Sequence, residues 1–294
     1  MNELLKQLSI DKDLIMALNT EDEKTEKIFE MFIDKVYYDT TKNSINNKLY
    51  YGPENALEVL RAGYGLHCQE ENFLLKDIYN FFGISNVLYH GDVYDFDTKI
   101  KKDVFMSVIV IDREEYFYHI DILHKIIMKV PKGEVAKKDN IVIEDLYKGY
   151  YLVKKYDGEE LYYMERIFNN LPEGYRKERI QKTYSNNSVT PFGVITPFYW
   201  KSNPERKIFY DAVQDKVKVN IGRKTAFLDL LYWDTAEESE WISKKQKENI
   251  KQCINKIGDN IDSYLDMIQN VNEKSIEFRL SKQDIENIKS GNYL

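Results

Sequence analysis

The sequence predicts an α+β protein in which helices come first, antiparallel strands follow, and helices return at the end. Apolar residues recur at helical spacing from Asn2 to about Lys35. Strand-like runs rich in β-branched and aromatic residues begin near Asn86, and helical spacing returns from Trp241. We therefore expect three regions: helices over residues 1–84, an antiparallel β-sheet or barrel with long loops over residues 85–204, and a mostly helical region over residues 205–294.

Two further helices are predicted before the first strand. One follows Pro53, a residue favoured in the first turn of a helix, and stops at the glycines Gly63 and Gly65. The other is amphipathic, runs from Cys68 to Phe82, and is ended by Gly83. Cys68 therefore falls in the first turn of its helix.

Short apolar runs separated by turn residues predict a sheet of at least five or six strands. The expected strands are Asn86–His90, Val104–Ile111, Tyr116–Leu123, Ile141–Ile143, Gly149–Lys154 and Leu161–Met164. The second and third form a hairpin through a tight turn at Asp112–Glu115. Residues 171–204 are rich in Pro, Asn, Ser and Gly, which is typical of long surface loops.

Composition and charge argue against several classes of protein. The 294 residues are 43% hydrophobic and 31% charged, which is enough to bury a substantial core. The formal charge is −7 and basic residues alternate with acids, so no stripe for binding a phosphate backbone is present. Residues Met1–Asp13 lack the apolar core of a signal peptide, and the longest apolar run, Val104–Ile111, is too short to cross a bilayer. We expect a cytoplasmic protein that binds neither nucleic acid nor membrane.

The two cysteines, Cys68 and Cys253, are far apart in the chain, so a disulfide framework is not predicted. A cysteine in the first turn of a helix feels the positive end of the helix dipole, which favours thiolate over thiol. Cys68 is therefore the candidate nucleophile, although packing in a core is the commoner fate of a single cysteine. Cys253 falls inside the predicted C-terminal helix, where we expect it to pack.

The run Arg61–Asn72, RAGYGLHCQEEN, resembles the nucleophile region of arylamine N-acetyltransferases and of transglutaminase-like enzymes. Both belong to the papain-like cysteine-enzyme superfamily. The resemblance continues through Gly83-Ile84 and Tyr116–Asp121, touches Tyr184–Phe192, and covers about residues 50 to 200. It implies a papain-like cysteine-enzyme fold in which the helix of Cys68 packs on a central antiparallel sheet or barrel. The subfamily stays open between the two.

This resemblance implies a mechanism in which a cysteine takes an acyl group from a thioester and passes it to an amine. A histidine acts as general base and an aspartate orients its imidazole. In this sequence Cys68 matches the nucleophile and Asp121 the aspartate, but Met106 stands where the resemblance places the histidine. Methionine cannot transfer a proton, so the base must come from another residue.

The predicted hairpin offers His119 as that base. With the turn centred on Arg113 and Glu114, Met106 would lie opposite Asp121. Alternate residues of a strand share a face, so His119 and Asp121 point the same way. We therefore expect Cys68, His119 and Asp121 to be catalytic. Two other histidines, His67 and His90, are alternative bases.

No motif in the sequence predicts a metal site or a permanently bound cofactor. His119 and His124 are an odd number of residues apart, so in a continuous strand they would face opposite sides. The segment Gly63-Tyr64-Gly65 is only a fragment of a dinucleotide-binding loop, and it follows a helix rather than a strand. Three acidic pairs are expected on solvated faces: Glu70-Glu71, Glu159-Glu160 and Glu237-Glu238.

The favoured function is a cysteine-dependent acyltransferase or amide synthase of small-molecule biosynthesis. Its cosubstrate would be an acyl thioester of coenzyme A or of carrier-protein phosphopantetheine, and its acceptor an amine. Two alternatives stay open. One is a thiol hydrolase or transglutaminase-like enzyme, which passes the same acyl group to water or to a protein lysine. The other is a non-catalytic ligand-binding protein whose active site was lost at Met106.

Overall fold

The computed structural model describes residues 1–33, 35–36, 38–39, 53–61, 66, 68–122, 124–146, 149–168, 194–196, 206–211, 216–221, 224–229 and 278–292. The chain divides into two compact units. The first unit combines Met1–Phe81 with Lys177–Ser275, and the second combines Phe82–Arg176 with Ile276–Leu294. The division of the sequence near residues 84 and 204 stays a prediction.

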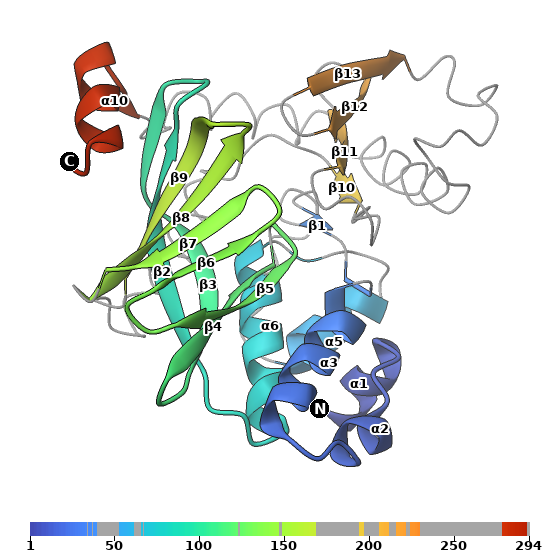
Figure 1. Ribbon diagram of the computed structural model, residues 1–294. Coiled ribbons are helices and arrows are strands. Elements are labelled where there is room, and N and C mark those ends of the chain that lie inside the picture. Colours follow the sequence, from blue (N-terminus) through green and yellow to red (C-terminus); the bar gives the residue numbers. More distant parts are fainter. Residues whose placement is uncertain are drawn as a thin grey trace. The chain divides into compact units, whose positions relative to one another are not determined.

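Helices dominate the N-terminal part of the first unit, as the sequence predicts (Figure 1). They are α1 (Asn2–Gln7), α2 (Lys12–Met16), α3 (Glu21–Ile33), α5 (Pro53–Arg61) and α6 (Cys68–Phe81). Side chains cap two of them: Asp11 Oδ1 accepts a 3.0 Å hydrogen bond from the Leu14 amide. Thr20 and Glu23 cap α3 reciprocally, each side chain accepting from the backbone amide of the other. Gly83, with φ of +78°, follows α6 in the left-handed conformation that ends many helices.

Helices α3 and α6 pack against each other, and a buried hydrogen bond links them. The hydroxyl of Tyr79 on α6 donates to the carbonyl oxygen of Thr25 on α3 at 3.1 Å. The first turn of α6 buries two acidic side chains: Glu70 and Glu71 are 1% and 2% exposed. The prediction that this acidic pair lies on a solvated face is wrong, whereas Glu159 and Glu160 are exposed as predicted.

The first unit also contains a five-stranded antiparallel sheet that the sequence analysis did not predict. Its order is β1 (Tyr38–Asp39), β10 (Val194–Thr196), β11 (Arg206–Asp211), β12 (Lys216–Ile221) and β13 (Lys224–Asp229). Three of these strands lie within residues 205–294, where mostly helix is expected. The predicted helix from Trp241 and the other predicted loops of residues 171–204 lie outside the described residues.

The second unit is built on one strongly curled antiparallel sheet, which confirms the prediction of an antiparallel sheet or barrel (Figure 1). Its strands are β2 (Val87–Asp95), β3 (Ile100–Asp112), β4 (Tyr116–Asp121), β5 (Ile126–Pro131), β6 (Val135–Lys138), β7 (Ile141–Asp145), β8 (Tyr150–Asp157) and β9 (Glu160–Phe168). Strands adjacent in sequence pair throughout, except β5 and β6, and β9 pairs with β2. The short turn 132–134 joins β5 to β6, so the two ends of the sheet approach each other and form a nearly closed barrel.

Side chains from six strands meet on the concave side of this sheet. The cluster contains Val108, Val110, Phe117, Ile126, Met128, Val130, Ile141, Ile143, Tyr151, Val153 and Ile167. The convex side carries a second cluster, which joins Tyr94, Phe96, Leu152 and Met164 to Leu280 and Ile288. Leu280 precedes α10 (Lys282–Lys289), and β14 (Phe278–Arg279) pairs with β3. No helix among the described residues is long and apolar enough to cross a bilayer.

Gly91 on β2 leaves no room for a side chain against β9. Its Cα is paired with that of Ile167, and a side chain on Gly91 would clash with Ile167 Cδ1. The same added carbon would lie 3.1 Å from the carbonyl oxygen of Arg166. Only glycine therefore fits at this point without displacing its neighbours.

We predict that Gly91→Ala lowers the free energy of unfolding by about 1–3 kcal/mol through overpacking. Ile167→Val alone should cost about 1 kcal/mol, because it removes one buried methyl group. The double variant should cost less than the sum of the two, since the clashing Cδ1 is gone. Urea denaturation of the four proteins measures the coupling, and strict additivity would contradict this account of Gly91.

Candidate functional site

The residues predicted to be catalytic are divided between the two units. Cys68 is the first residue of α6, in the first unit. His119 and Asp121 lie on β4, in the second unit, and both are fully buried. The side chain of Cys68 and the whole of His67 lie outside the described residues.

His119 and Asp121 lie on the concave side of the curled sheet. Phe117, two residues before His119, belongs to the concave cluster. Residues two apart along a strand point to the same face, so all three side chains point the same way. The shared face of His119 and Asp121 is therefore as predicted. His119 and Asp121 therefore make part of this interior polar.

The register of the β3–β4 hairpin differs from the predicted one. His119 pairs with Val110, and Ile120 with Ile109. Continuing this register puts Val108, not Met106, opposite Asp121. The turn is one residue later than expected, because Arg113 donates its amide to the carbonyl oxygen of Tyr116 and so leaves Glu114 and Glu115 at the tip.

Asp121 is hydrogen-bonded to His124, three residues further along the chain. Asp121 Oδ2 lies 2.5 Å from His124 Nδ1, and Asp121 Oδ1 accepts a 3.0 Å hydrogen bond from the His124 backbone amide. β4 ends at Asp121 and the chain turns, with the Lys125 amide donating to the Ile122 carbonyl oxygen. The expectation that His119 and His124 face opposite ways assumed a continuous strand. The turn returns the ring of His124 to Asp121.

A second carboxylate faces the same ring nitrogen. Glu165 Oε1, on β9, lies 3.5 Å from His124 Nδ1 and accepts a 2.7 Å hydrogen bond from the hydroxyl of Tyr163. The ring of Tyr163 stands edge-on to that of His124, with centroids 5.6 Å apart. Burial, with the charge of Glu165, raises the pKa of Tyr163 well above its ordinary value, so its hydroxyl stays a donor.

Neighbouring side chains stabilise the negative charge of Asp121. Burial alone would raise the pKa of Asp121. The charge and hydrogen bond of His124, together with His119 and Lys155, outweigh burial and hold the pKa well below its usual range. Lys155 is itself buried, and its Nζ lies 4.7 Å from the ring centroid of Tyr163. Asp121 is therefore a carboxylate at neutral pH.

His119 has a different partner. Its Nδ1 lies 2.8 Å from the hydroxyl of Tyr151, and its Nε2 has no hydrogen-bond partner among the described residues. Burial lowers the pKa of His119 to about 4, with Asp121 opposing the shift and Lys155 adding to it. His119 is therefore neutral at pH 7. The third histidine, His90, is on the opposite face of the sheet, where it contacts Ser107 at 3.2 Å.

One group of these side chains has the composition of a metal site. One ligand atom from each of Asp121, His124 and Glu165 lies within 4.8 Å of the others. The short contact between Asp121 and His124, however, is a direct hydrogen bond through Nδ1, the nitrogen that an ion at this position would need. The arrangement as it stands is that of an imidazole whose Nδ1 faces two carboxyl groups.

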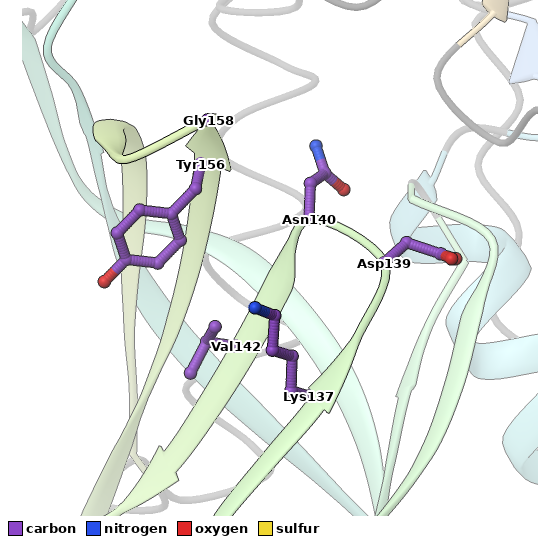
Figure 2. A pocket seen from close by; sticks show the side chains of 6 residues that line it. All are labelled: Lys137, Asp139, Asn140, Val142, Tyr156 and Gly158. Atoms are coloured by element: carbon purple, nitrogen blue, oxygen red, sulfur yellow. The ribbon is translucent and has the colours of Figure 1, made fainter.

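An open pocket of about 390 Å³ lies at the tips of two hairpins of the second unit (Figure 2). It is lined by Lys137, Asp139, Asn140, Val142, Tyr156 and Gly158. Val142 and Tyr156 alternate with Ile143 and Lys155, which point into the curled sheet, so the pocket is on the convex face. None of the predicted catalytic residues lines it.

We predict that His119 makes the stability of the protein depend on pH. Its folded-state pKa of about 4 lies below the ordinary 6.5, so the unfolded chain binds the extra proton between these values. This contribution is fully present above about pH 6.5 and is lost as the pH falls toward 4. His119→Gln should therefore lose about 2 kcal/mol less stability than the parent between pH 7 and pH 5. Urea denaturation at both pH values measures the difference, and identical losses would contradict the prediction.

Neither a protein-family model nor a curated protein sequence matches the chain. Solved structures do match it. The arylamine N-acetyltransferase of Mycobacterium abscessus superposes with a TM-score of 0.60 at 10% identity, over 86% of this chain and 94% of that one. Arylamine N-acetyltransferase C of Bacillus anthracis gives 0.58 at 17% identity, over 87% and 97%.

A third structure is an arylamine N-acetyltransferase of Bacillus cereus described as having a unique Cys-His-Glu catalytic triad. It gives a TM-score of 0.55 at 14% identity, over 82% of this chain and 98% of that one. At such low identities the likeness concerns the fold, and it extends over nearly the whole length of each of these proteins. The chain therefore has the fold of the arylamine N-acetyltransferases, an α+β fold with a mostly antiparallel, nearly closed sheet.

Proposed function

We propose that the protein is a cysteine-dependent acyltransferase or amide synthase. Cys68 takes an acyl group from a thioester, holds it as an acyl-enzyme, and delivers it to an amine. The observation that carries this proposal is a buried aspartate, Asp121, hydrogen-bonded to an imidazole in a chain with the arylamine N-acetyltransferase fold. An aspartate–imidazole pair is the part of a cysteine enzyme that accepts and returns the thiol proton.

The position of Cys68 supports its role as nucleophile. It is the first residue of α6, a helix that extends to Phe81. The N-terminus of a helix carries partial positive charge, which favours the thiolate form of a cysteine at that position. Cys253 lies outside the described residues, and the sequence places it inside a predicted helix instead of at its start.

The reaction divides into two acyl transfers. The Cys68 thiolate attacks the carbonyl carbon of the donor, the carbon–sulfur bond of the donor breaks, and the released thiolate takes a proton. The amine then attacks the acyl-enzyme, losing a proton as the Cys68 sulfur leaves. One histidine can serve both halves, as base and then as acid. His119, the predicted base, and His124 both interact with Asp121.

We assign the donor to an acyl thioester of coenzyme A or of a carrier-protein phosphopantetheine arm, and the acceptor to an amine of small-molecule biosynthesis. The cosubstrate leaves after each turnover, so no cofactor is bound permanently. Methionine at position 106, where the resemblance places a histidine, favours a specialised donor over acetyl-coenzyme A. The carrier protein would then be the partner of the enzyme.

We predict that a matching acyl thioester adds the mass of its acyl group to the protein. Intact-protein mass spectrometry after incubation with a panel of acyl-coenzyme A and acyl-carrier-protein thioesters measures this. Cys68→Ala should abolish the adduct, because it removes the sulfur that forms the new bond. Cys253→Ser, the matched control at the other cysteine, should keep it.

The two alternative functions give different results in the same experiment. A hydrolase would lose the adduct on standing in water without an amine, whereas an amide synthase would keep it until an amine is added. No adduct with any donor would contradict an enzymatic role and favour a ligand-binding protein. An adduct on Cys253 would contradict the assignment of Cys68.

A further inference from the structure

The histidine that Asp121 orients is fixed by more contacts than a single hydrogen bond. One oxygen of Asp121 holds the ring of His124 and the other holds its backbone amide, so the carboxylate sets both the turn and the ring. Glu165 Oε1 lies 3.5 Å from the same Nδ1 and is itself held by Tyr163. Since carboxylates only accept hydrogen bonds, they place the ring proton on Nδ1. In the neutral ring the lone pair is then on Nε2.

His119 lacks this arrangement. Its Nδ1 meets the hydroxyl of Tyr151 instead of a carboxylate, and its side chain is 0% exposed, compared with 8% for His124. Burial lowers the pKa of His119 to about 4, so protonating it at neutral pH is unfavourable. A base must hold a proton during each half-reaction, and two carboxylates stabilise the imidazolium of His124 in that state.

We propose that His124, in the turn after β4, is the general base of the acyl transfer, that Asp121 orients it, and that Glu165 is a second positioning residue. This inference rests on the proposed function of Cys68. His119 is then a neutral histidine of the barrel interior, bonded to Tyr151. The sequence could not single out His124, because the turn after β4 directs its ring to Asp121, and its other carboxylate partner, Glu165, comes from β9, which is not adjacent to β4 in the sheet.

The proton moves in a closed cycle. His124 Nε2 takes the proton of the Cys68 thiol, so that an S–H bond breaks and an N–H bond forms. The thiolate attacks the thioester, and the imidazolium returns the proton to the departing donor thiolate. In the second half Nε2 takes a proton from the attacking amine, and the imidazolium delivers it to the Cys68 sulfur as the acyl–sulfur bond breaks.

Alkylation of Cys68 by iodoacetamide tests this assignment without a substrate. A parent protein carrying Cys253→Ser has one thiol, and intact-protein mass spectrometry follows its alkylation from pH 5.5 to 9. An ordinary thiol of pKa about 8.5 is only about 3% ionised at pH 7, so losing the base should slow alkylation there by up to about thirtyfold, with the helix dipole retaining part of the thiolate. We expect this loss with His124→Gln and no comparable loss with His119→Gln. His90→Gln, a buried histidine on the other face, is the matched control.

A second variant guards against misfolding of His124→Gln, which thermal denaturation would reveal. In Asp121→Asn the His124 backbone amide still needs the side-chain oxygen, so the new NH₂ group faces Nδ1 and forces the ring proton onto Nε2. Alkylation at neutral pH should fall as with His124→Gln. Glu165→Gln should shift the pH profile by less, because the 3.5 Å contact is the longer one.

Among the described residues, Asp121, Glu165 and Tyr163 are titratable groups that face His124, with His119 and Lys155 acting through Asp121. If His119→Gln slows alkylation and His124→Gln does not, the inference is overturned while the proposed function stands. If Cys68 of the parent reacts no faster than a simple thiol, the proposed function fails, and the assignment of its base fails with it.

Discussion

The hydrogen-bonded contact between Asp121 and His124 is the interaction on which the chemistry of the second unit depends. It brings a turn residue back to the end of a buried strand and occupies both oxygens of one carboxylate. A buried carboxylate without such partners would be strongly destabilising. With them it remains charged, and its charge in turn governs the histidine that it contacts.

The curled sheet adds Glu165 to the contact between Asp121 and His124. Because its first and last strands pair, β4 and β9 bring their inward side chains into one interior, and Glu165 reaches a ring that belongs to the turn after β4. The rest of that interior is apolar, so the carboxylates interact in surroundings of low polarizability, where charge interactions are strong. Lys155, also buried, supplies compensating positive charge. The fold is that of the arylamine N-acetyltransferases, while the imidazole next to the aspartate comes from a different place than the sequence resemblance implies.

Much of the secondary structure followed from local patterns. Helical spacing and a following glycine predicted α6 to within one residue, because amphipathic periodicity and a left-handed cap are properties of the segment itself. The patterns of β3, β4 and β8 predicted these strands with ends that differ by up to four residues. The strands β5 and β6 were missed, as was the sheet of β10 to β13. β6 and β10 are only four and three residues long, and pairing with neighbouring strands makes such short segments strands.

The candidate site shows the same boundary between local and tertiary information. From the sequence alone came Cys68 at the start of a helix, Asp121 on the same strand face as His119, and the absence of a histidine at position 106. The β3–β4 turn, which lies one residue later than expected, and the reversal of the chain after Asp121 are set by backbone hydrogen bonds that no spacing rule anticipates. The partner of Asp121 was therefore decided only by the tertiary structure, because a hydrogen bond depends on where a turn directs a side chain and on which strands the closing sheet brings beside it.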